Sequence, residues 1–532
     1  MASAVSTELE VTDVERSDED ATERTPLQGQ PSTSGKKLRT RNKFAYGVGG
    51  MPYQLTNTVI GFYIAIFLLD TADLRPLYVS IIIFFGRFWD AVTDPIVGIL
   101  ITKTNTRFGK LKPWMAAAAP LAAGMYVLLW TVPDFDSSVA GFFWYLFFYC
   151  GFQTVLTCYH LPYTALTMLI SEEQQERDSA TVFRMASEVV GNLLGNILMG
   201  QSILAFTRNE GGKDCLTGNE TETNISHAIK REELGYQVGA SMISVVVLVS
   251  AATVLFGTTE LKINKGQRGK IPLRKALPKI ISFKPYWTLI GAFLFFITAI
   301  QSIQGNFALY CKYTLHIDNY QNLIIVVLAS AFVFMPLWSC LLRKLGKKKC
   351  MAIGAATSFP LLVVYAVLQP NQEWVMYVFS ILAGNAIAVV QLVPWSMVPD
   401  VIDHFLIKHG QSYETIFYSF FVMFVKFATG VSLGISTMVL GLVGYKNGYC
   451  EQPEAVAFTL RLLVTAFPCL CIFIGYAFLW VYPITEDVRQ KNKTILEIWR
   501  DDEDEGRRKT VKVSKEQRIR TRSFRTPSTT LL

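Results

Sequence analysis

Apolar residues are grouped along the chain in twelve long runs, which are separated by short polar segments. Each run has about 20 residues or more, enough for an α-helix to cross a hydrocarbon layer of roughly 30 Å. Lipid offers no hydrogen-bond partners to the backbone, so such runs must be helical, and the alternating pattern of a membrane barrel is not seen. The predicted spans are about 44–69, 77–101, 113–133, 140–168, 178–206, 235–257, 286–311, 320–342, 350–369, 374–398, 413–443 and 457–481.

The composition agrees with an all-α membrane protein. Of the 532 residues, 51% are hydrophobic and only 17% are charged, which excludes an ordinary soluble domain. The first forty residues are polar and acidic and contain no apolar core followed by small residues. No signal peptide is therefore expected, and the first span should direct insertion.

Lysine and arginine residues gather in the segments that lie on one side of the predicted membrane topology. They precede the first span and follow the second, sixth and eighth spans, and the net charge of the chain is +8. Because basic loops are retained on the cytoplasmic side, both termini are predicted to be cytoplasmic. These loops suit anionic lipid of the inner leaflet rather than nucleic acid.

Two short motifs recur in the second half of the chain at nearly the same separation. Gly109 and Gly346 lie in basic segments after the second and eighth spans, and Pro162 and Pro394 lie near the ends of the fourth and tenth. The repeat favours two six-helix bundles around a central cavity, although Pro- and Gly-rich helix ends can also match by coincidence. The predicted organisation is a cytoplasmic N-tail 1–42, bundles 43–257 and 286–482, a basic linker 258–285 between them, and a cytoplasmic C-tail 483–532.

Two acids, Asp90 and Asp94, lie inside the second span. Four residues are just over one helical turn, so both carboxylates share one face. A charge deep in a bilayer costs roughly 2.5–3.5 kcal/mol even on a lenient scale, so a pair of like charges favours an ion or proton site between them. The alternative is a structural pair that forms salt bridges with Arg87 or with a lysine elsewhere.

Three more charged residues lie within or close to predicted spans. Lys426 is the single charge between Tyr418 and Thr437 of the eleventh span, far from either polar flank, and needs an anionic partner such as Asp90, Asp94 or a substrate phosphate. Arg184 and Glu188 are four residues apart in the fifth span and can pair with each other. Arg184 is equally placed to hold a phosphate, because its planar fork donates two hydrogen bonds.

Polar side chains in several spans are candidates for a cavity lining, among them Thr157, although each one alone is better explained by packing or by hydrogen bonds between helices. The remaining candidates are Tyr53, Gln54, Asn57, Gln153, Thr154, His160 and Asn306. No nucleotide-binding loop, metal cluster or nucleophilic serine motif stands out, so no enzyme activity and no cofactor are expected.

Two cysteines lie in loops that the charge pattern places outside the cell, Cys215 after the fifth span and Cys450 after the eleventh. Disulfides persist in that compartment, and a bridge between these two would tie the two halves together. The first of these loops also holds two glycosylation sequons, at Asn219 and Asn224.

The segment from Trp89 to Pro95, with its two acids, resembles the cation site of the melibiose-permease-like branch of the major facilitator superfamily. Longer motifs resemble the animal sodium-dependent lysophosphatidylcholine symporters and their sphingosine-1-phosphate-exporting relatives. These motifs are Gly49–Gln54, Pro162–Met168, Glu176–Thr181, Pro394–Asp403 and Lys426–Thr437. The resemblance runs from about Lys43 to Asn492.

The resemblance implies a twelve-helix alternating-access symporter that carries Na⁺ together with a lysolipid. Asp90 and Asp94 would bind Na⁺, Lys426 would contact the phosphate or relay ion occupancy, and Arg184 would serve the headgroup. Cys215 and Cys450 would match the external disulfide of the family. Glu188, Thr157 and Gln304 join the substrate and coupling set. The sequence departs from the lysophosphatidylcholine members at Gln304, where they have a glutamate.

We expect a monomeric plasma-membrane symporter of lysophosphatidylcholine that carries a long fatty acid, with the endoplasmic reticulum as a second location. Sphingosine-1-phosphate export stays open as an alternative. The first aspartate favours the sodium-coupled branch, whereas Pro162–Met168 and Glu414–Ser419 resemble the exporter branch. Sugar transport and an intramembrane acyl-transferring enzyme that uses His160 also stay open at this point.

Overall fold

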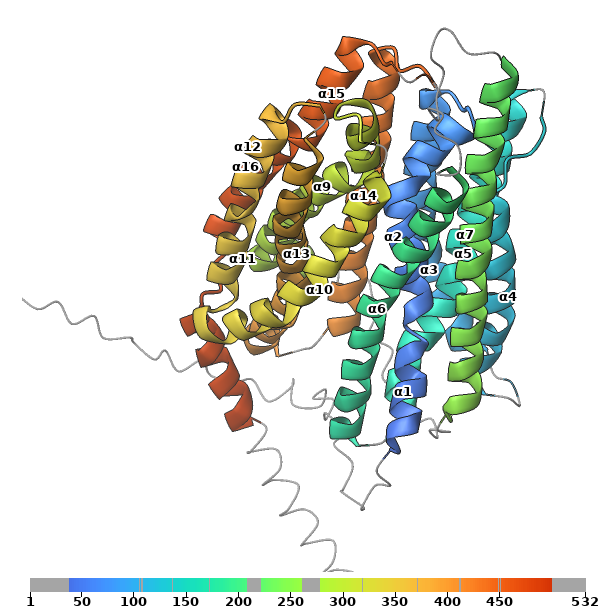
Figure 1. The fold of residues 1–532 in the computed structure, drawn as a ribbon. Helices are drawn as coiled ribbons and strands as arrows, with labels where there is room; N and C mark the ends of the chain where they lie inside the picture. Colours follow the sequence, from blue (N-terminus) through green and yellow to red (C-terminus); the bar gives the residue numbers. More distant parts are fainter. Residues whose placement is uncertain are drawn as a thin grey trace, which may run out of the picture.

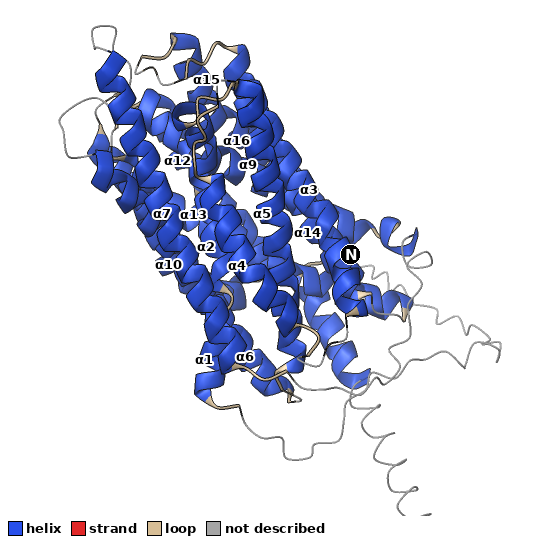
Figure 2. Ribbon diagram, turned by 90° about the vertical axis from the view of Figure 1, so that its right-hand side faces the viewer, coloured by secondary structure: helices blue, strands red, loops and turns tan. Residues whose placement is uncertain are grey.

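The computed structural model describes residues 38–499, apart from 105, 107–108, 136, 172, 208–221, 261–277, 318, 371, 411–412, 448 and 450. This part of the chain is nearly all helical, and no strand is seen in it (Figure 2). Its helices are α1 (Thr40–Val48), α2 (Met51–Ile66), η2 (Phe67–Thr71), α3 (Pro76–Lys103), α4 (Lys112–Leu129), α5 (Ser138–Leu166), η3 (Thr167–Leu169), α6 (Gln174–Thr207), α7 (Glu222–Gly257), α9 (Lys284–Tyr313), α10 (Tyr320–Leu345), α11 (Lys347–Ala356), α12 (Ser358–Val367), α13 (Glu373–His409), α14 (Glu414–Leu442), α15 (Glu454–Val464) and α16 (Ala466–Val481).

Eleven helical segments in the described part are long and apolar enough to cross a membrane, one fewer than the twelve predicted spans. The remaining predicted span, 113–133, is α4, an 18-residue helix that begins with a lysine and contains Pro120. It runs beside α5 and α7 like the other spans (Figure 1). The all-helical membrane fold is confirmed.

Three predicted spans are interrupted rather than continuous. The first is broken at Gly49–Gly50, the ninth at Thr357 and the last at Thr465. In each case a proline lies in the first turn of the following helix: Pro52, Pro360 and Pro468. Proline has no backbone N–H to donate, so in the first turn it costs no helical hydrogen bond, whereas a proline inside a helix, such as Pro120 of α4, removes one.

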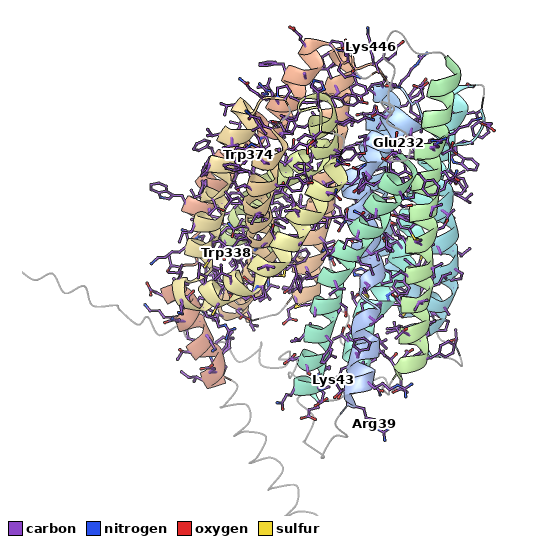
Figure 3. All side chains as sticks on the ribbon, in the orientation of Figure 1. Arg39, Lys43, Glu232, Trp338, Trp374 and Lys446 are labelled. Carbon is purple, nitrogen blue, oxygen red and sulfur yellow. The ribbon has the colours of Figure 1, made fainter. Side chains whose placement is uncertain are left out.

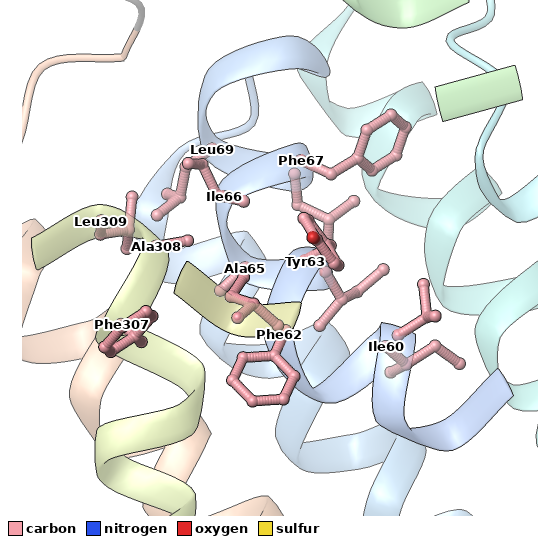
Figure 4. Packing of buried hydrophobic residues seen from close by; sticks show 14 of the residues in the cluster. Ile60, Phe62, Tyr63, Ala65, Ile66, Phe67, Leu69, Phe307, Ala308 and Leu309 are labelled. Carbon is pink, nitrogen blue, oxygen red and sulfur yellow. The ribbon is translucent and has the colours of Figure 1, made fainter. Parts of the chain in front are cut away.

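The helices form two groups that lie side by side, α1–α7 and α9–α16 (Figure 1). We call them the first and second halves. They meet where α3 packs on α14, α2 on α9 and α6 on α10. Figure 4 shows the α2–α9 contact, where apolar side chains of both helices enter one buried cluster. Arg39 and Lys43 lie at one end of the molecule, the inner end, and Lys446 lies at the opposite, outer end (Figure 3).

Glycine residues of α14 allow α3 to lie against it without intervening side chains. A Cβ atom at Gly430 would lie 2.7 Å from the Cβ of Arg87, and one at Gly434 would lie 2.9 Å from the Cβ of Phe84. Small residues at such a face permit close approach of membrane helices. The approach brings the charged residue of α14 within reach of the acids of α3.

Residues 483–532 were expected to form a tail, but part of that segment is folded. Residues 486–499 form a helix at the inner end of the second half. Its Asn492 is buried, and the side-chain amide lies 3.1 Å from Nδ1 of His404. Leu496, one turn further on, is buried as well, so the helix docks through one face.

Candidate functional site

The predicted site residues of the second and eleventh spans meet between the two halves. α3 supplies Asp90 and Asp94, and α14 supplies Lys426. The Nζ atom of Lys426 lies 2.9 Å from Oδ1 of Asp90 and 2.6 Å from Oδ2 of Asp94. One ammonium group therefore joins two carboxylates across the interface, and these acids are the anionic partners that Lys426 requires.

Thr157 of α5 completes this group. Its hydroxyl oxygen lies 3.1 Å from Oδ1 of Asp90 and 3.0 Å from Oδ1 of Asp94. A hydroxyl has one proton, so it donates to one of these carboxylates at a time. One oxygen atom of each carboxylate thus lies within hydrogen-bond distance of the hydroxyl oxygen, and oxygen atoms are the ligands that hard cations prefer. We refer to Asp90, Asp94, Thr157 and Lys426 as the ion cluster.

The members of the ion cluster are not equally buried. The side chain of Asp90 is 4% exposed and that of Lys426 is 10% exposed, whereas that of Asp94 is 21% exposed. A buried ion pair is favourable only when its charges compensate each other closely. The two carboxylates and one ammonium group of the cluster together carry an excess negative charge. Asp94 is the more exposed acid, so a cation can approach the cluster past its side chain.

A second cation lies near this cluster without joining it directly. Arg87 precedes Asp90 by three residues on α3, and its Nη1 donates to Oδ1 of Asn57 at 2.9 Å. The arginine side chain is buried. The sequence offers Arg87 as a possible structural partner of the two acids, but both carboxylates contact Lys426 and Thr157 instead. Arg87 contributes positive potential rather than a contact.

Arg184 and Glu188 form an ion pair with each other on α6, with Nε and Oε1 3.2 Å apart. They lie against the break between α1 and α2, where a Cβ on Gly50 would meet both side chains. His160 stacks on Tyr53 with ring centroids 3.9 Å apart. It is within electrostatic range of both Arg184 and Lys426, so this aromatic pair lies near both charged groups.

Gln304 of α9 lines a partly open apolar cavity. Its walls come mainly from the second half, with Phe296, Leu361 and Val390 among them, and Phe62 of α2 closes one side. The Gln304 amide packs on Gly61 of α2, where an added Cβ would lie 2.5 Å from Nε2. The lining of the cavity is therefore mainly apolar, with the amide of Gln304 at the contact between the halves.

Several residues predicted from the sequence are not placed by the structure. Cys215, Cys450 and Asn219 lie outside the described residues, and Asn224 is described only as a position in α7. Conversely, the sequence does not predict a second inter-half group at the outer end, around Asp70. Its signal is weak, because a single charge at the end of a span is usually a solvated flank.

Within the described part of the chain, no group of three or more His, Cys, Asp or Glu residues could hold a metal ion. The oxygen set of the ion cluster has two carboxylates and one hydroxyl. That set suits a weakly held, exchangeable cation better than a resident metal.

Comparison with known proteins identifies relatives along nearly the whole chain. The family model for MFS/sugar transport proteins matches residues 45–486. The chain is 42% identical over 480 residues to sodium-dependent lysophosphatidylcholine symporter 1 of Mus musculus, covering 88% of this chain and 90% of that protein. It is 40% identical over 498 residues to the Homo sapiens protein of the same name, covering 89% and 91%. It is 38% identical over 474 residues to the sphingosine-1-phosphate transporter MFSD2B of Xenopus tropicalis, covering 87% and 92%.

Solved structures with the same fold are more distant in sequence. A bacterial homologue of the human lysosomal transporter Spinster, in an inward-facing and unoccupied conformation, has a TM-score of 0.57 at 12% identity, covering 85% of this chain and 97% of that one. The D-xylose–proton symporter has a TM-score of 0.55 at 12% identity, covering 84% and 98%. At these identities the likeness establishes the fold.

Proposed function

The chain belongs to the MFS/sugar transport protein family, and from that membership we propose that it is a sodium-coupled symporter of lysophospholipids, with lysophosphatidylcholine as the main substrate. Its relatives and its fold are those of transporters, so the enzymatic alternative through His160 is set aside. The observation that carries the proposal is the sharing of one ammonium group by two carboxylates between the halves.

Sodium and the Lys426 ammonium group compete for the same carboxylates in this proposal. Na⁺ approaches past the more exposed Asp94 and takes oxygen contacts from Asp90, Asp94 and Thr157. Its charge offsets the excess negative charge of the two acids, and the ammonium group is then free to leave them. A freed Lys426 attracts an anionic phosphate, so occupancy of the ion site controls occupancy of the substrate site.

The lysophospholipid needs a polar place for its headgroup and an apolar place for its acyl chain. Arg184 supplies a fork of donors that suits phosphate, and Glu188 beside it supplies a negative charge for a quaternary ammonium. The cavity lined by Gln304 supplies apolar volume for the chain. The headgroup site on α6 and the acyl-chain site on α9 thus lie in different halves of the protein, and Gln304 lies where the two halves meet.

Export of sphingosine-1-phosphate is the second candidate. It is supported by the 38% identity to a transporter named for that lipid and by the neutral side chain at Gln304. Transport assays in proteoliposomes, with the labelled lipid added outside to measure uptake or loaded inside to measure release, separate the two candidates. Sodium-dependent uptake of lysophosphatidylcholine supports the first, and sodium-independent release of sphingosine-1-phosphate supports the second.

We further propose that the protein acts as a monomer in the plasma membrane with both termini in the cytoplasm, since its basic segments favour that orientation. We propose a Cys215–Cys450 disulfide and glycans on Asn219 and Asn224, which would all lie outside the cell in that orientation. No cofactor beyond the coupling ion is needed for this cycle.

The test of the proposed function is sodium-driven uptake by the Asp94→Asn variant. The change keeps the shape of the side chain and removes its charge, so uptake is expected to lose its dependence on Na⁺. Asp134→Asn, which alters an exposed acid of the first half, is the matched control and should transport normally. Both variants are compared at equal surface abundance. Intact sodium-driven uptake by Asp94→Asn would contradict the ion-site assignment.

A further inference from the structure

A second polar group joins the two halves at the outer end. It is centred on Asp70 of η2, whose side chain is 2% exposed. Oδ2 of Asp70 accepts hydrogen bonds from Lys312 Nζ at 3.1 Å and from the Tyr313 hydroxyl at 2.5 Å. Oδ1 accepts one from the Tyr445 hydroxyl at 2.5 Å. All three donors belong to the second half. We refer to these four residues as the outer cluster.

The local backbone turns Asp70 toward these donors. The chain leaves α2 through the π-helical turn η2, in which the N–H of Ala72 bonds to the carbonyl of Phe67 at 2.8 Å. Such a turn inserts one residue into the helical repeat and rotates the side chains that follow. Asp73, two positions after the end of η2, has a positive φ of 48° that ends the helix. The bend is therefore built around the acid.

The donors of the outer cluster are themselves held firmly. Tyr313 and Tyr445 are both buried, and their rings meet edge to face with centroids 5.8 Å apart. The Nζ atom of Lys312 lies 5.3 Å from the centre of the Tyr313 ring. Both carboxylate oxygens of Asp70 thus accept a tyrosine hydrogen bond, and the ammonium group of Lys312 lies near the Tyr313 ring as well. The hydrogen-bonding capacity of the carboxylate is therefore largely used.

Other contacts between the halves reinforce the outer end. The side-chain amide of Asn447 donates to Oδ1 of Asp73 at 3.0 Å and to the carbonyl of Leu74 at 2.9 Å. Gln201 of α6 donates to Asn322 of α10 at 3.1 Å. These bonds close the outer end on both sides of the outer cluster.

The ion pairs seen at the inner end have a different arrangement. Lys43 pairs with Glu176 at 2.8 Å, within the first half. Lys347 pairs with Asp400 at 2.8 Å, within the second half. Val182 of α6, towards the same end, is 65% exposed. The structure is therefore held together between its halves at the outer end, as expected of an inward-facing state.

We propose that Asp70 is the closing residue of an outer gate, and that Lys312, Tyr313 and Tyr445 must all leave its carboxylate before the transporter opens outward. A buried carboxylate that has lost one donor is poorly solvated, whereas full separation exposes it to water. Partial opening is therefore unfavourable, and the gate has two states. The site differs from the ion cluster and involves neither Na⁺ nor the lipid directly.

Hydrogen exchange of the full-length protein in lipid nanodiscs tests this gate. Asp70→Asn removes the charge, so exchange in segments 67–74 and 440–447 is expected to rise about tenfold, as the outward-open state gains population. Exchange in the inner segments 178–190 and 414–426 is expected to fall in the same sample, because the inner end closes when the outer end opens. Asp134→Asn is the control for loss of an acid near the outer end of the first half.

Opposite changes at the two ends distinguish a gate from a structural residue. Tyr445→Phe removes one donor and keeps the ring, and it should give a smaller change in the same two directions. Unchanged exchange at the outer segments in Asp70→Asn would overturn the proposal. A rise at both ends would overturn it as well, because it would identify Asp70 as a residue that stabilises the fold and not one conformation.

Discussion

The ion cluster and the outer cluster are built from the same parts in different proportions. In each, aspartate from the first half meets lysine from the second half in a buried place. In the outer cluster, three donors serve the single carboxylate of Asp70. In the ion cluster, two carboxylates share one ammonium group and one hydroxyl.

This difference in the number of donors per carboxylate suits the outer cluster to closing the outer end and the ion cluster to binding a second cation. A carboxylate with three donors has little left to offer another cation, so the outer cluster acts as a contact that is either made or broken. Two carboxylates that share one cation retain affinity for a second one. A family fold can therefore place the same residue pair at two levels of one interface and obtain different functions from the number of donors alone.

Matched substitutions of the two lysines should give the largest contrast. Lys426→Met leaves the buried Asp90 and the partly exposed Asp94 without a cation, and removal of one partner of a buried ion pair destabilises a protein by about 3–5 kcal/mol. Lys312→Met leaves Asp70 with two tyrosine donors, so a smaller loss of about 1.5–3 kcal/mol is expected. Thermal unfolding of both variants in sodium-free detergent compares them. Equal losses would remove the distinction between the clusters.

A double variant sharpens this comparison. Asp90→Asn combined with Lys426→Met removes one acid along with the cation, so about half of the loss caused by Lys426→Met should be recovered, on the order of 1.5–2.5 kcal/mol. The same unfolding measurement applies. Additive losses would show that Asp90 and Lys426 do not interact energetically, despite their 2.9 Å contact.

Thr157→Val tests the hydroxyl of the ion cluster. Loss of one oxygen contact should weaken the apparent affinity for Na⁺ by about tenfold, which corresponds to about 1.4 kcal/mol, while uptake at saturating Na⁺ stays near its normal value. Thr157→Ser keeps the hydroxyl and serves as the control. An unchanged sodium dependence in the valine variant would show that Thr157 only orients the carboxylates.

Gln304→Glu should have the smallest effect. A carboxylate at the edge of the apolar cavity attracts the quaternary ammonium of lysophosphatidylcholine and repels the terminal phosphate of sphingosine-1-phosphate. The ratio of lysophosphatidylcholine to sphingosine-1-phosphate transport should therefore rise a few-fold, equivalent to about 1 kcal/mol. Competition between the two labelled lipids measures this ratio. A fall in the ratio would show that Gln304 does not face the headgroup.

The sequence is sufficient to predict most of the ion cluster because charge inside an apolar run is rare and expensive. Asp90, Asp94 and Lys426 stand out for that reason, and the structure brings them together. Thr157 is only one of many polar candidates in the sequence, since a threonine in a span is common. The spacing of Arg184 and Glu188 allows them to pair with each other or to serve a phosphate, and spacing alone cannot decide between the two.

The outer cluster shows what the sequence leaves hidden. Asp70 and Lys312 lie at the ends of spans, where charge is ordinary, and Tyr445 lies in a loop. Nothing local to any of them indicates that three separate segments converge. The same holds for Gln304, whose place beside an apolar cavity depends on helices that are far apart in the chain. The break at Gly49–Gly50 likewise depends on local proline and glycine geometry that hydropathy does not reveal.

Sodium-dependent stabilisation of the Lys426→Met variant tests the competition between Na⁺ and the lysine most directly. If both cations occupy the same carboxylates, Na⁺ should bind this variant about tenfold more tightly than the unaltered protein and raise its melting temperature at lower concentration, with choline chloride as the ionic-strength control. The Lys426→Met/Asp94→Asn double variant should lose this response. An equal sodium dependence in the unaltered protein and Lys426→Met would contradict the claim that the ion and the ammonium group exchange at one site.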